Sequence, residues 1–304
     1  MELVILAAGM GSRFGGLKQI EPIDEYGNFI LDYSVYDAIK AGFESVIFVI
    51  KEELYDDFRN TVGKRIEDKI KTKYVFQKLE DLPDGYSCPD GRIKPWGTAH
   101  AVLAVRDIVE DDFIMINADD FYGRDAFITA ANYFKSLEKG SKGRYANIVY
   151  SVENTMTENG SVKRAVCFSD DNNNCIEMIE STIEKDLKGN IIGTELENPS
   201  NKRILKPGHF VSMNMFAFTK DIIDDLARLF PIFLEKSKNN LLSCEYLIPS
   251  VVTQLFKEGK ASLKLLSTSA VWYGITYKQD KDFVVSSLKK LVDSGEYTKG
   301  LWIK

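Results

Sequence analysis

The sequence has few cysteines, few histidines and no long apolar run. Its 304 residues include 4 cysteines and 2 histidines, and no two cysteines form a Cys-x-x-Cys pair. This pattern indicates neither a zinc site nor a disulfide framework. No apolar stretch approaches the roughly 20 residues that a membrane-spanning helix needs. The apolar run at residues 3–8 has no basic segment before it, so we predict a first strand there, not a signal peptide, and a cytoplasmic setting.

Positive charge is not in excess either. The chain carries 39 Lys and Arg against 45 Asp and Glu, which gives a formal net charge of −6. Nucleic-acid binders are usually basic, so we expect no nucleic acid and no membrane among the partners. Apolar residues make up 44% of the chain, which is too apolar for a disordered protein. We therefore predict one globular domain over residues 1–304.

Strand and helix patterns alternate in the first part of the chain. A buried strand at 3–6 is followed by helical spacing over 31–41 and by a β-rich run at 45–50. This βαβ order predicts a parallel sheet. The alternation continues with a helix over 53–71, a strand at 73–77, a helix over 97–105 and a strand at 113–118.

The strict alternation of strands and helices ends after a helix predicted over 127–137. Short β-type runs follow at 146–152, 165–169, 175–180, 211–218 and 261–271, and helices are predicted over 221–236, 245–257 and 282–294. Asn and Asp cluster at 170–174, which predicts a hairpin. We expect the polar stretch 185–206 to be a mobile loop. The fold predicted is α/β, with a Rossmann-like open mixed sheet flanked by helices, and comprises lobes 1–125 and 126–280 with a C-terminal helix at 281–304.

A glycine-rich turn follows the first strand, where residues 6–19 read LAAGMGSRFGGLKQ. Ligands of open α/β sheets bind at the carboxyl ends of strands, and glycines let the backbone approach an anion. The dinucleotide fingerprint does not fit because position 14 is Phe, and the triphosphatase loop does not fit because Leu17 separates Gly16 from Lys18. We predict a phosphate site to which Arg13 and Lys18 add positive charge.

Several segments in order resemble the nucleotidyltransferases that make nucleotide sugars from a sugar 1-phosphate. Besides the first turn, these segments are KYVFQ at 73–77, PWGTAHAV at 95–102, INADDFYG at 116–123 and SCEYLIP at 243–249. Ala118 replaces the usual glycine of the third segment. The resemblance extends over residues 1–280 and is strongest before Gly123.

The resemblance implies a nucleotide-diphospho-sugar transferase fold and a Mg²⁺-dependent reaction of a nucleoside triphosphate with a sugar 1-phosphate. Such chemistry needs positioning and charge neutralisation, which agrees with the lack of a Ser-His-Asp pattern. The catalytic residues implied are Arg13, Lys18 and Asp119, with Asp119 holding the metal. The nucleotide-binding residues implied are Leu6, Ala8, Gly9, Gly11, Ser12, Gln77, Gly97 and Thr98. The sugar-binding residues implied, in a smaller β-rich lobe, are Gly160, Glu180, Asn214 and Glu245.

The sequence departs from the family at two ligand positions. Ser181 and Thr182 follow Glu180 where the family often has Lys-Pro, so the cation for the sugar phosphate is unassigned. The candidates for it are Lys163, Arg164, Lys185 and Lys206. Relatives also place an Asp or Asn after the late strand, but residues 272–277 read WYGITY. We assign the second metal ligand to Asp280; Asp120, or Thr276 through water, is the alternative.

The choice of base is predicted from Gln77. Its amide offers one donor and one acceptor, which complement the N3–H and a carbonyl of uracil or thymine, so UTP or dTTP is favoured. Two alternatives remain. One is cytidylyl transfer to a non-sugar phosphorylated acceptor, and the other is a nucleotide-sugar sensor that has lost catalysis. A homo-oligomer is left open.

Overall fold

The computed structural model describes residues 1–9, 22–157, 160–274 and 280–302. The strands of the main sheet are β1 (Glu2–Leu6), β2 (Ser45–Ile50), β3 (Lys71–Phe76), β4 (Phe113–Asn117), β6 (Arg144–Ser151), β7 (Val162–Ser169), β8 (Cys175–Lys185), β9 (Ile191–Glu195), β10 (Lys202–Leu205), β11 (Phe210–Phe218) and β12 (Ser262–Thr268). Strands β5 (Asp120–Phe121) and β13 (Tyr273–Gly274) form a second, two-stranded sheet. The α-helices are α1 (Ile30–Ala41), α2 (Tyr55–Phe58), α3 (Lys64–Ile66), α4 (Thr98–Leu103), α5 (Arg124–Ser136), α6 (Ile222–Lys236), α7 (Ile248–Lys257) and α8 (Asp280–Asp293).

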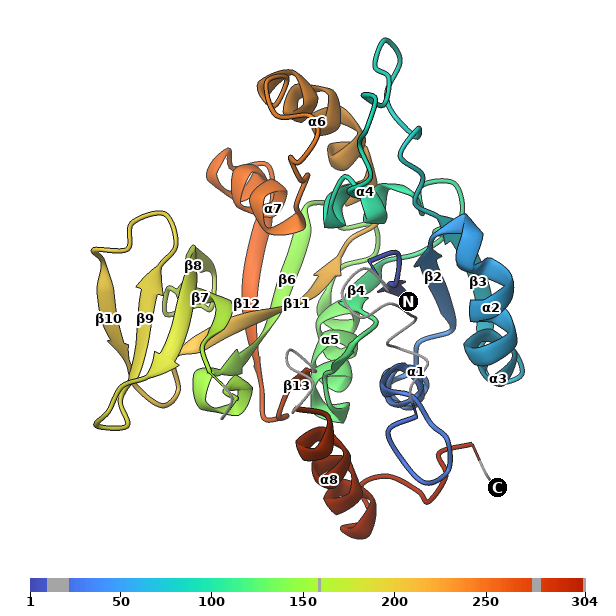
Figure 1. The fold of residues 1–304 in the computed structure, drawn as a ribbon, viewed down its shortest axis with the longest axis vertical. Coiled ribbons are helices and arrows are strands. Elements are labelled where there is room, and N and C mark those ends of the chain that lie inside the picture. The colour runs from blue at the N-terminus through green and yellow to red at the C-terminus, as the bar shows by residue number, and fades with distance from the viewer. Residues whose placement is uncertain (10–21, 158–159, 275–279, 303–304) are drawn as a thin grey trace.

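The main sheet has 11 strands and mixed directions, which confirms the predicted open mixed sheet (Figure 1). Its order is β10-β9-β8-β7-β11-β4-β1-β2-β3, and β6 joins β11 to β12. The chain moves from β1 to β2 and β3 on one side, and β4 then pairs in parallel on the other side of β1. The strand order reverses between β1 and β4, and ligands of open α/β sheets bind at the carboxyl ends of the strands at such a point.

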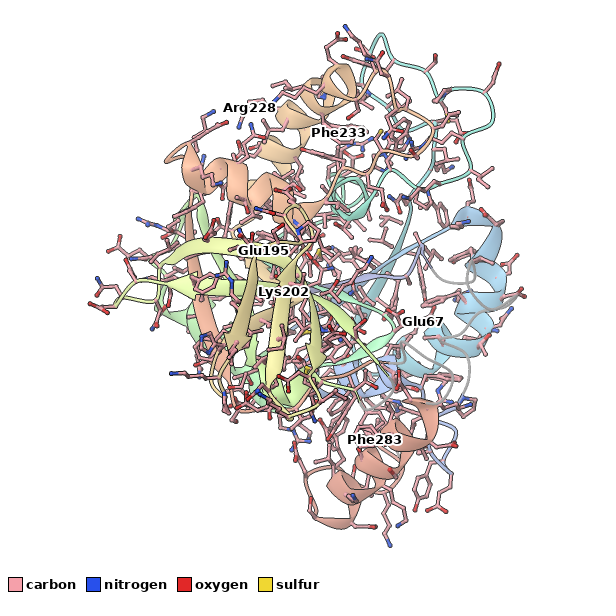
Figure 2. All side chains as sticks on the ribbon, turned by 60° about the vertical axis from the view of Figure 1, so that its left-hand side comes forward. Glu67, Glu195, Lys202, Arg228, Phe233 and Phe283 are labelled. Atoms are coloured by element: carbon pink, nitrogen blue, oxygen red, sulfur yellow. The ribbon has the colours of Figure 1, made fainter. Side chains whose placement is uncertain are left out.

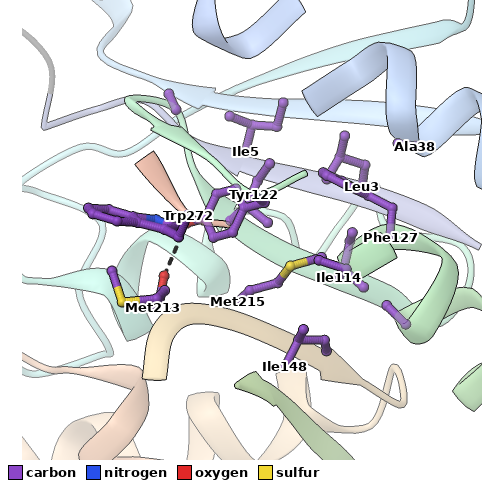
Figure 3. Packing of buried hydrophobic residues seen from close by; sticks show 14 of the residues in the cluster. Leu3, Ile5, Ala38, Ile114, Tyr122, Phe127, Ile148, Met213, Met215 and Trp272 are labelled. Atoms are coloured by element: carbon purple, nitrogen blue, oxygen red, sulfur yellow. Dashed lines mark hydrogen bonds between the residues drawn. The ribbon is translucent and has the colours of Figure 1, made fainter. Parts of the chain in front are cut away.

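Helices cover both faces of this sheet. Leu3 and Ile5 of β1 pack on the side of α1 and α5, whereas Val4 packs on the side of α4, α6 and α7. Successive side chains of a strand point to opposite faces, so a strand between two helical layers is apolar throughout. Figure 3 shows part of the first of these clusters, where Leu3 and Ile5 lie near Ala38 of α1 and Phe127 of α5.

The predicted mobile loop at 185–206 is wrong, because this stretch forms β9 and β10. The two strands extend the sheet beyond β8 as antiparallel neighbours. The Asp186 carboxylate accepts the backbone N–H groups of Lys188 at 2.8 Å and Asn190 at 2.9 Å, which closes the β8–β9 turn. Polar residues here serve turns and an edge strand, so their polarity does not indicate a loop. Glu195 and Lys202, labelled in Figure 2, mark the end of β9 and the start of β10.

Two predicted helices have different bounds. The helix predicted from 245 begins at Ile248, because Leu247 is extended (φ −107°, ψ 138°) and the first turn contains Pro249. The helix predicted over 53–71 is instead a series of short 3₁₀, α and π turns that ends at Ile66. The π turn contains Gly63, where a Cβ would lie 2.0 Å from the Tyr74 hydroxyl, so this segment packs closely on β3. The other predicted strands and helices are confirmed within a few residues.

The C-terminal segment is held on α1 by two buried carboxylates. The Tyr297 hydroxyl donates to Asp37 at 2.5 Å, and the Trp302 indole donates to Asp32 at 3.0 Å. Burial raises the pKa of Asp37 to about 7. Helix α8 and the residues after it thereby cover α1, as Figure 1 shows at the foot of the molecule. Within the described ranges, no helix has the length and apolar character needed to cross a membrane.

Candidate functional site

A cavity of about 250 Å³ lies where β1, β2 and β3 end. Its lining residues follow these three strands or belong to the loop before α4: Ala8, Lys51, Glu52, Glu53, Gln77, Lys78, Leu79, Glu80, Ile93 and Pro95. Ligands of open α/β sheets bind at this edge. The structure therefore brings Ala8 and Gln77, two of the predicted nucleotide-binding residues, to one cavity.

The amide of Gln77 is oriented by His100. The His100 Nε2 lies 2.8 Å from the Asp81 carbonyl oxygen, which only accepts, so Nε2 carries a proton. Burial lowers the pKa of His100, which keeps the ring neutral and makes Nδ1 an acceptor. The Gln77 Nε2 donates to this Nδ1 at 3.1 Å and to the Gly97 carbonyl at 3.0 Å. Both amide hydrogens thus have protein acceptors, and the carbonyl Oε1 is the Gln77 atom left for a ligand.

Lowering the pH is expected to destabilise this arrangement. The folded protein holds His100 with a pKa below its usual 6.5, so the unfolded chain binds the proton first. The contribution of His100 to the free energy of unfolding should be complete above pH 6.5 and lost as the pH falls through the lowered pKa. Urea unfolding on both sides of that pH measures the loss. In the His100→Gln variant this part of the pH dependence should vanish, and an unchanged profile would contradict the neutral ring.

Gly97 is held against the segment before α7. Its φ is +110°, and a Cβ there would lie 2.4 Å from the Tyr246 carbonyl oxygen. The Ala99 N–H donates to that oxygen at 2.9 Å, and the Tyr246 N–H donates to the Trp96 carbonyl at 2.5 Å. The space that a side chain at Gly97 would need is therefore taken by the Tyr246 backbone.

The nucleotide-side and sugar-side motifs meet at this point. The Thr98 hydroxyl accepts the Ile248 N–H at 3.0 Å and so binds the first turn of α7. Glu245 is exposed and forms an ion pair with Lys94 at 2.7 Å. The predicted nucleotide-binding Thr98 and the predicted sugar-binding Glu245 therefore belong to two segments, far apart in sequence, that are joined by hydrogen bonds and an ion pair.

Arg92 stabilises the same junction and was not singled out from the sequence. Its guanidinium lies 3.5 Å from the centre of the Trp96 ring, and it donates to the Cys244 carbonyl at 2.9 Å and the Pro95 carbonyl at 3.0 Å. The side chain is buried, with 5% of the residue exposed. A buried arginine that binds several carbonyls fixes loop geometry. The only sequence signal was one arginine within a loop rich in proline and glycine.

Asp119 and Asp120 follow β4, which pairs in parallel with β1. Asp119 is exposed and follows Ala118, whose N–H donates to the Leu6 carbonyl at 3.1 Å. Asp120 accepts the Asn117 amide at 2.9 Å. Burial, together with the neighbouring Asp119 charge, raises the pKa of Asp120 to about 7. Predicted residue Leu6 of β1 thus pairs with Asn117, two residues before predicted residue Asp119.

A line of polar side chains connects the end of β4 to β11 and β6. The Asn214 amide donates to the Asn117 Oδ1 at 2.8 Å. Asn214 has a φ of +60° at an irregularity of β11, a conformation that asparagine adopts more readily than most residues. Behind it, the Asn147 amide donates to the buried Ser212 hydroxyl at 2.8 Å. The predicted sugar-binding Asn214 is therefore bonded to the strand end that carries Asp119.

Among the four cation candidates, Arg164 alone is partly buried, while Lys163, Lys185 and Lys206 are exposed. Arg164 lies on β7 directly opposite Ser181, and its guanidinium is 4.6 Å from the centre of the Trp272 ring. Burial lowers the pKa of Arg164, and the charges of Asp120 and Glu180 oppose this effect. The predicted sugar-binding residues nearby are Glu180, exposed on β8, and Gly160, exposed with a φ of +134° before β7.

The metal ligands stay predictions. Asp280 begins α8, is 4% exposed and accepts the Thr157 hydroxyl at 2.9 Å. Within residues 1–9, 22–157, 160–274 and 280–302, no three His, Cys, Asp or Glu side chains are grouped as a metal site would require. Mg²⁺ is commonly bound by one or two carboxylates and by substrate phosphates, so the exposed Asp119 fits such a metal in donor type. Predicted residues Gly11, Ser12, Arg13, Lys18 and Thr276 lie outside the described residues, and Gly9, exposed, borders them.

A cavity and an exposed carboxylate at the carboxyl edge of an α/β sheet are typical of proteins that bind phosphorylated ligands there. The chain belongs to the nucleotidyl transferase family, whose model matches residues 2–275. This confirms the family predicted from the motifs.

The chain is 29% identical over 186 residues to the bifunctional protein GlmU of Methanocaldococcus jannaschii, covering 59% of this chain and 36% of that protein. It is 23% identical over 206 residues to the low-salt glycan biosynthesis nucleotidyltransferase Agl11 of Haloferax volcanii, covering 66% and 50%. The chain thus spans half or less of the length of these relatives.

Solved structures share the fold. A protein described as a glucose-1-phosphate thymidylyltransferase from Bacillus anthracis matches with a TM-score of 0.63 and 16% identity, covering 99% of this chain and 98% of that one. A UDP-glucose pyrophosphorylase complexed with UDP-glucose matches with a TM-score of 0.57 and 18% identity, covering 95% and 98%. The inositol-1-phosphate CTP transferase from T. maritima matches with a TM-score of 0.56 and 15% identity, covering 95% and 96%. These likenesses confirm the predicted fold.

Proposed function

We propose that the protein transfers the nucleotidyl group of UTP or dTTP to a sugar 1-phosphate, with Mg²⁺, and releases pyrophosphate. The observation that carries the proposal is the arrangement at one edge of the sheet. Gln77 lines a cavity after β3, Asp119 follows β4, and Asn214 of the second lobe is bonded to the same strand end. We assign the nucleotide to the lobe at 1–125 and the acceptor to the lobe at 126–280.

The preference for uracil or thymine rests on Gln77. Its two amide hydrogens are bonded to His100 and Gly97, so its Oε1 offers an acceptor to the base. The N3–H of uracil or thymine donates to such an oxygen. Cytosine has no hydrogen at N3, and its lone pair there would face the Gln77 oxygen. The proposed partner of Gln77 is therefore an imide N3–H.

The reaction depends on how the protein positions the two substrates and needs no covalent nucleophile from the protein. A phosphate oxygen of the acceptor attacks the α-phosphorus, a new P–O bond forms, and the bond to the β-phosphate oxygen breaks with its electrons leaving on pyrophosphate. We assign Arg13 and the backbone at 9–12 to the β- and γ-phosphates and Lys18 to the α-phosphate. Mg²⁺, held by Asp119 and substrate phosphates, would supply charge neutralisation.

Pyrophosphate release with Mg²⁺ tests the proposal. UTP, dTTP, CTP and GTP are each offered with a panel of hexose 1-phosphates and alcohol phosphates. We expect release with UTP or dTTP and a hexose 1-phosphate. Release with CTP and inositol 1-phosphate alone would favour inositol-1-phosphate CTP transfer, the activity of the T. maritima protein that shares the fold. Nucleotide-sugar binding without any release would favour a sensor.

Replacing Gln77 with leucine is expected to lower kcat/KM for UTP about 10- to 100-fold. The variant removes the oxygen that accepts the N3–H of the base. That N3–H would then be buried without an acceptor, which costs roughly 1–3 kcal/mol. Gln254→Leu is the matched control, because that amide lies on α7 and donates to Glu258 at 2.8 Å. Thermal unfolding of each variant checks that the fold persists. Equal kcat/KM in Gln77→Leu and wild type would remove Gln77 from base recognition.

A further inference from the structure

Two buried N–H donors in the second lobe lack hydrogen-bond acceptors. They are Arg164 Nε and Trp272 Nε1, neither of which has a partner in the part of the chain that the structure describes. They belong to one contact, since the guanidinium lies 4.6 Å from the Trp272 ring centre. An unpaired buried donor costs about 1–3 kcal/mol. Two in a single contact therefore indicate that a ligand supplies the acceptor atoms.

Arg164 differs from the other arginines with an unpaired Nε. Arg65 and Arg92 also leave this atom without a partner, but both of their terminal nitrogens are bonded to acceptors elsewhere in the chain. The hydrogen bond of Arg164 runs to the carbonyl of Lys163, the preceding residue, at 2.7 Å. Among the described residues, Arg65 and Arg92 thus fix the fold through both terminal nitrogens, whereas this bond of Arg164 reaches only the neighbouring carbonyl and its Nε has no acceptor.

The two donors lie beside the edge that carries Asp119. Trp272 precedes β13, and Gly274 of β13 pairs with Asp120 of β5. A Cβ on Gly274 would lie 2.1 Å from the Trp272 ring and 3.0 Å from the Asp120 Oδ1, so the ring and the carboxylate flank the same glycine. Figure 3 shows Trp272 beside Met213 and Tyr122, whose hydroxyl donates to the Met213 carbonyl at 3.2 Å. The donors are therefore next to the proposed reaction centre.

The chemistry of the pair fits an anion. A guanidinium is always charged and presents its donors in a plane that matches phosphate oxygens. The Trp272 ring lies 4.6 Å from the guanidinium, and its indole N–H adds a neutral donor next to the cation. A phosphate carries negative charge that a sugar hydroxyl lacks, so it adds to the attraction that Asp120 and Glu180 exert on the largely buried guanidinium.

We infer that Arg164, with the indole N–H of Trp272, binds the phosphate of the acceptor. The inference rests on the proposed function, because that phosphate supplies the attacking oxygen. Arg164 lies on β7, in the lobe to which the acceptor is assigned, and Trp272 directly precedes β13, whose Gly274 pairs with Asp120. Arg164 and Trp272 thus favour acceptors that carry a phosphate group. They hold this phosphate next to the carboxylates of Asp119 and Asp120, which follow β4.

Kinetics of Arg164→Gln test the inference, with glucose 1-phosphate as the probe. We expect KM for glucose 1-phosphate to rise about 10- to 100-fold, since charged hydrogen bonds contribute roughly 1.5–3 kcal/mol. KM for UTP should stay close to the wild-type value. Arg164→Lys keeps the charge without the planar fork and should lie between the two. Trp272→Phe removes the N–H while keeping an aromatic ring and should raise the same KM a few-fold.

The matched control is Arg203→Gln. Arg203 also lies over an aromatic ring of the second lobe, at 5.2 Å from the centre of Phe168, but it is paired with Glu195 on β9. It should leave both KM values unchanged. Equal effects of the Arg164 and Arg203 variants on KM for glucose 1-phosphate, or a rise confined to KM for UTP, would overturn the inference.

Calorimetry separates this inference from the proposed function. Glucose 1-phosphate and inorganic phosphate are titrated into the wild type and Arg164→Gln without nucleotide. Binding by the wild type that is lost in the variant supports the inference even if no nucleotide leads to pyrophosphate release. Equal binding by both proteins, or no binding by the wild type, contradicts it even if turnover with sugar 1-phosphates is observed.

Discussion

Replacing Asp119 with alanine is expected to lower the rate of pyrophosphate release by at least about 1000-fold, which corresponds to roughly 4 kcal/mol of transition-state stabilisation. The carboxylate is exposed directly after β4, at the point where the strand order reverses. It is the group proposed to hold Mg²⁺ against the substrate phosphates. Since Asp119 is exposed, its removal should leave the apolar core and the free energy of unfolding nearly unchanged.

The comparison needs a matched aspartate. Asp107 is exposed, lies shortly before β4, and contacts Arg106 at 3.8 Å, so Asp107→Ala should keep the wild-type rate. Asp119→Asn separates charge from shape, and a loss close to that of alanine is expected because Mg²⁺ prefers carboxylate ligands. Arg13→Ala is expected to abolish turnover as well. Wild-type rates in Asp119→Ala would sink the assignment of this carboxylate.

Replacing Gly97 with alanine is expected to lower the free energy of unfolding by about 2–5 kcal/mol. The φ of +110° strains any residue with a side chain, and the new Cβ would lie 2.4 Å from the Tyr246 carbonyl oxygen. Backbone on both sides must then move, because the Ala99 N–H donates to that same oxygen. Gln77 and Thr98 are bonded on either side of this junction, so KM for the nucleotide should rise in the folded fraction.

A second glycine of the same loop isolates the steric part. Gly91 has a φ of +82°, but a Cβ on it would meet nothing within 4 Å. Gly91→Ala should therefore show only the conformational cost, about 1 kcal/mol. Urea unfolding of the two variants gives the difference. If Gly97→Ala is no less stable than Gly91→Ala, the close contact with Tyr246 does not restrict the backbone as argued.

Local patterns predicted much of the nucleotide-binding half of the molecule. The strand at 45–50 was predicted with the bounds that the structure has, and the order of strand and helix indicated the parallel pairing of β1 with β2. Because carboxyl ends of parallel strands meet at one edge, the positions of Ala8 and Gln77 in the sequence were enough to predict that they lie close together, as they do in one cavity. The polar stretch at 185–206 failed this kind of reasoning, since edge strands and turns have no continuous apolar face.

The sequence by itself determined the family, the alternation that builds the sheet, and which motifs lie at its carboxyl edge, because these depend on near neighbours in the chain. Only the tertiary structure shows which of those residues contact one another. In it, both amide hydrogens of Gln77 are bonded to His100 and Gly97, and the guanidinium of Arg164 on β7 lies next to the Trp272 ring. Such contacts join residues from separate elements, and hydrogen bonds and burial depend on distances that spacing along the chain does not specify.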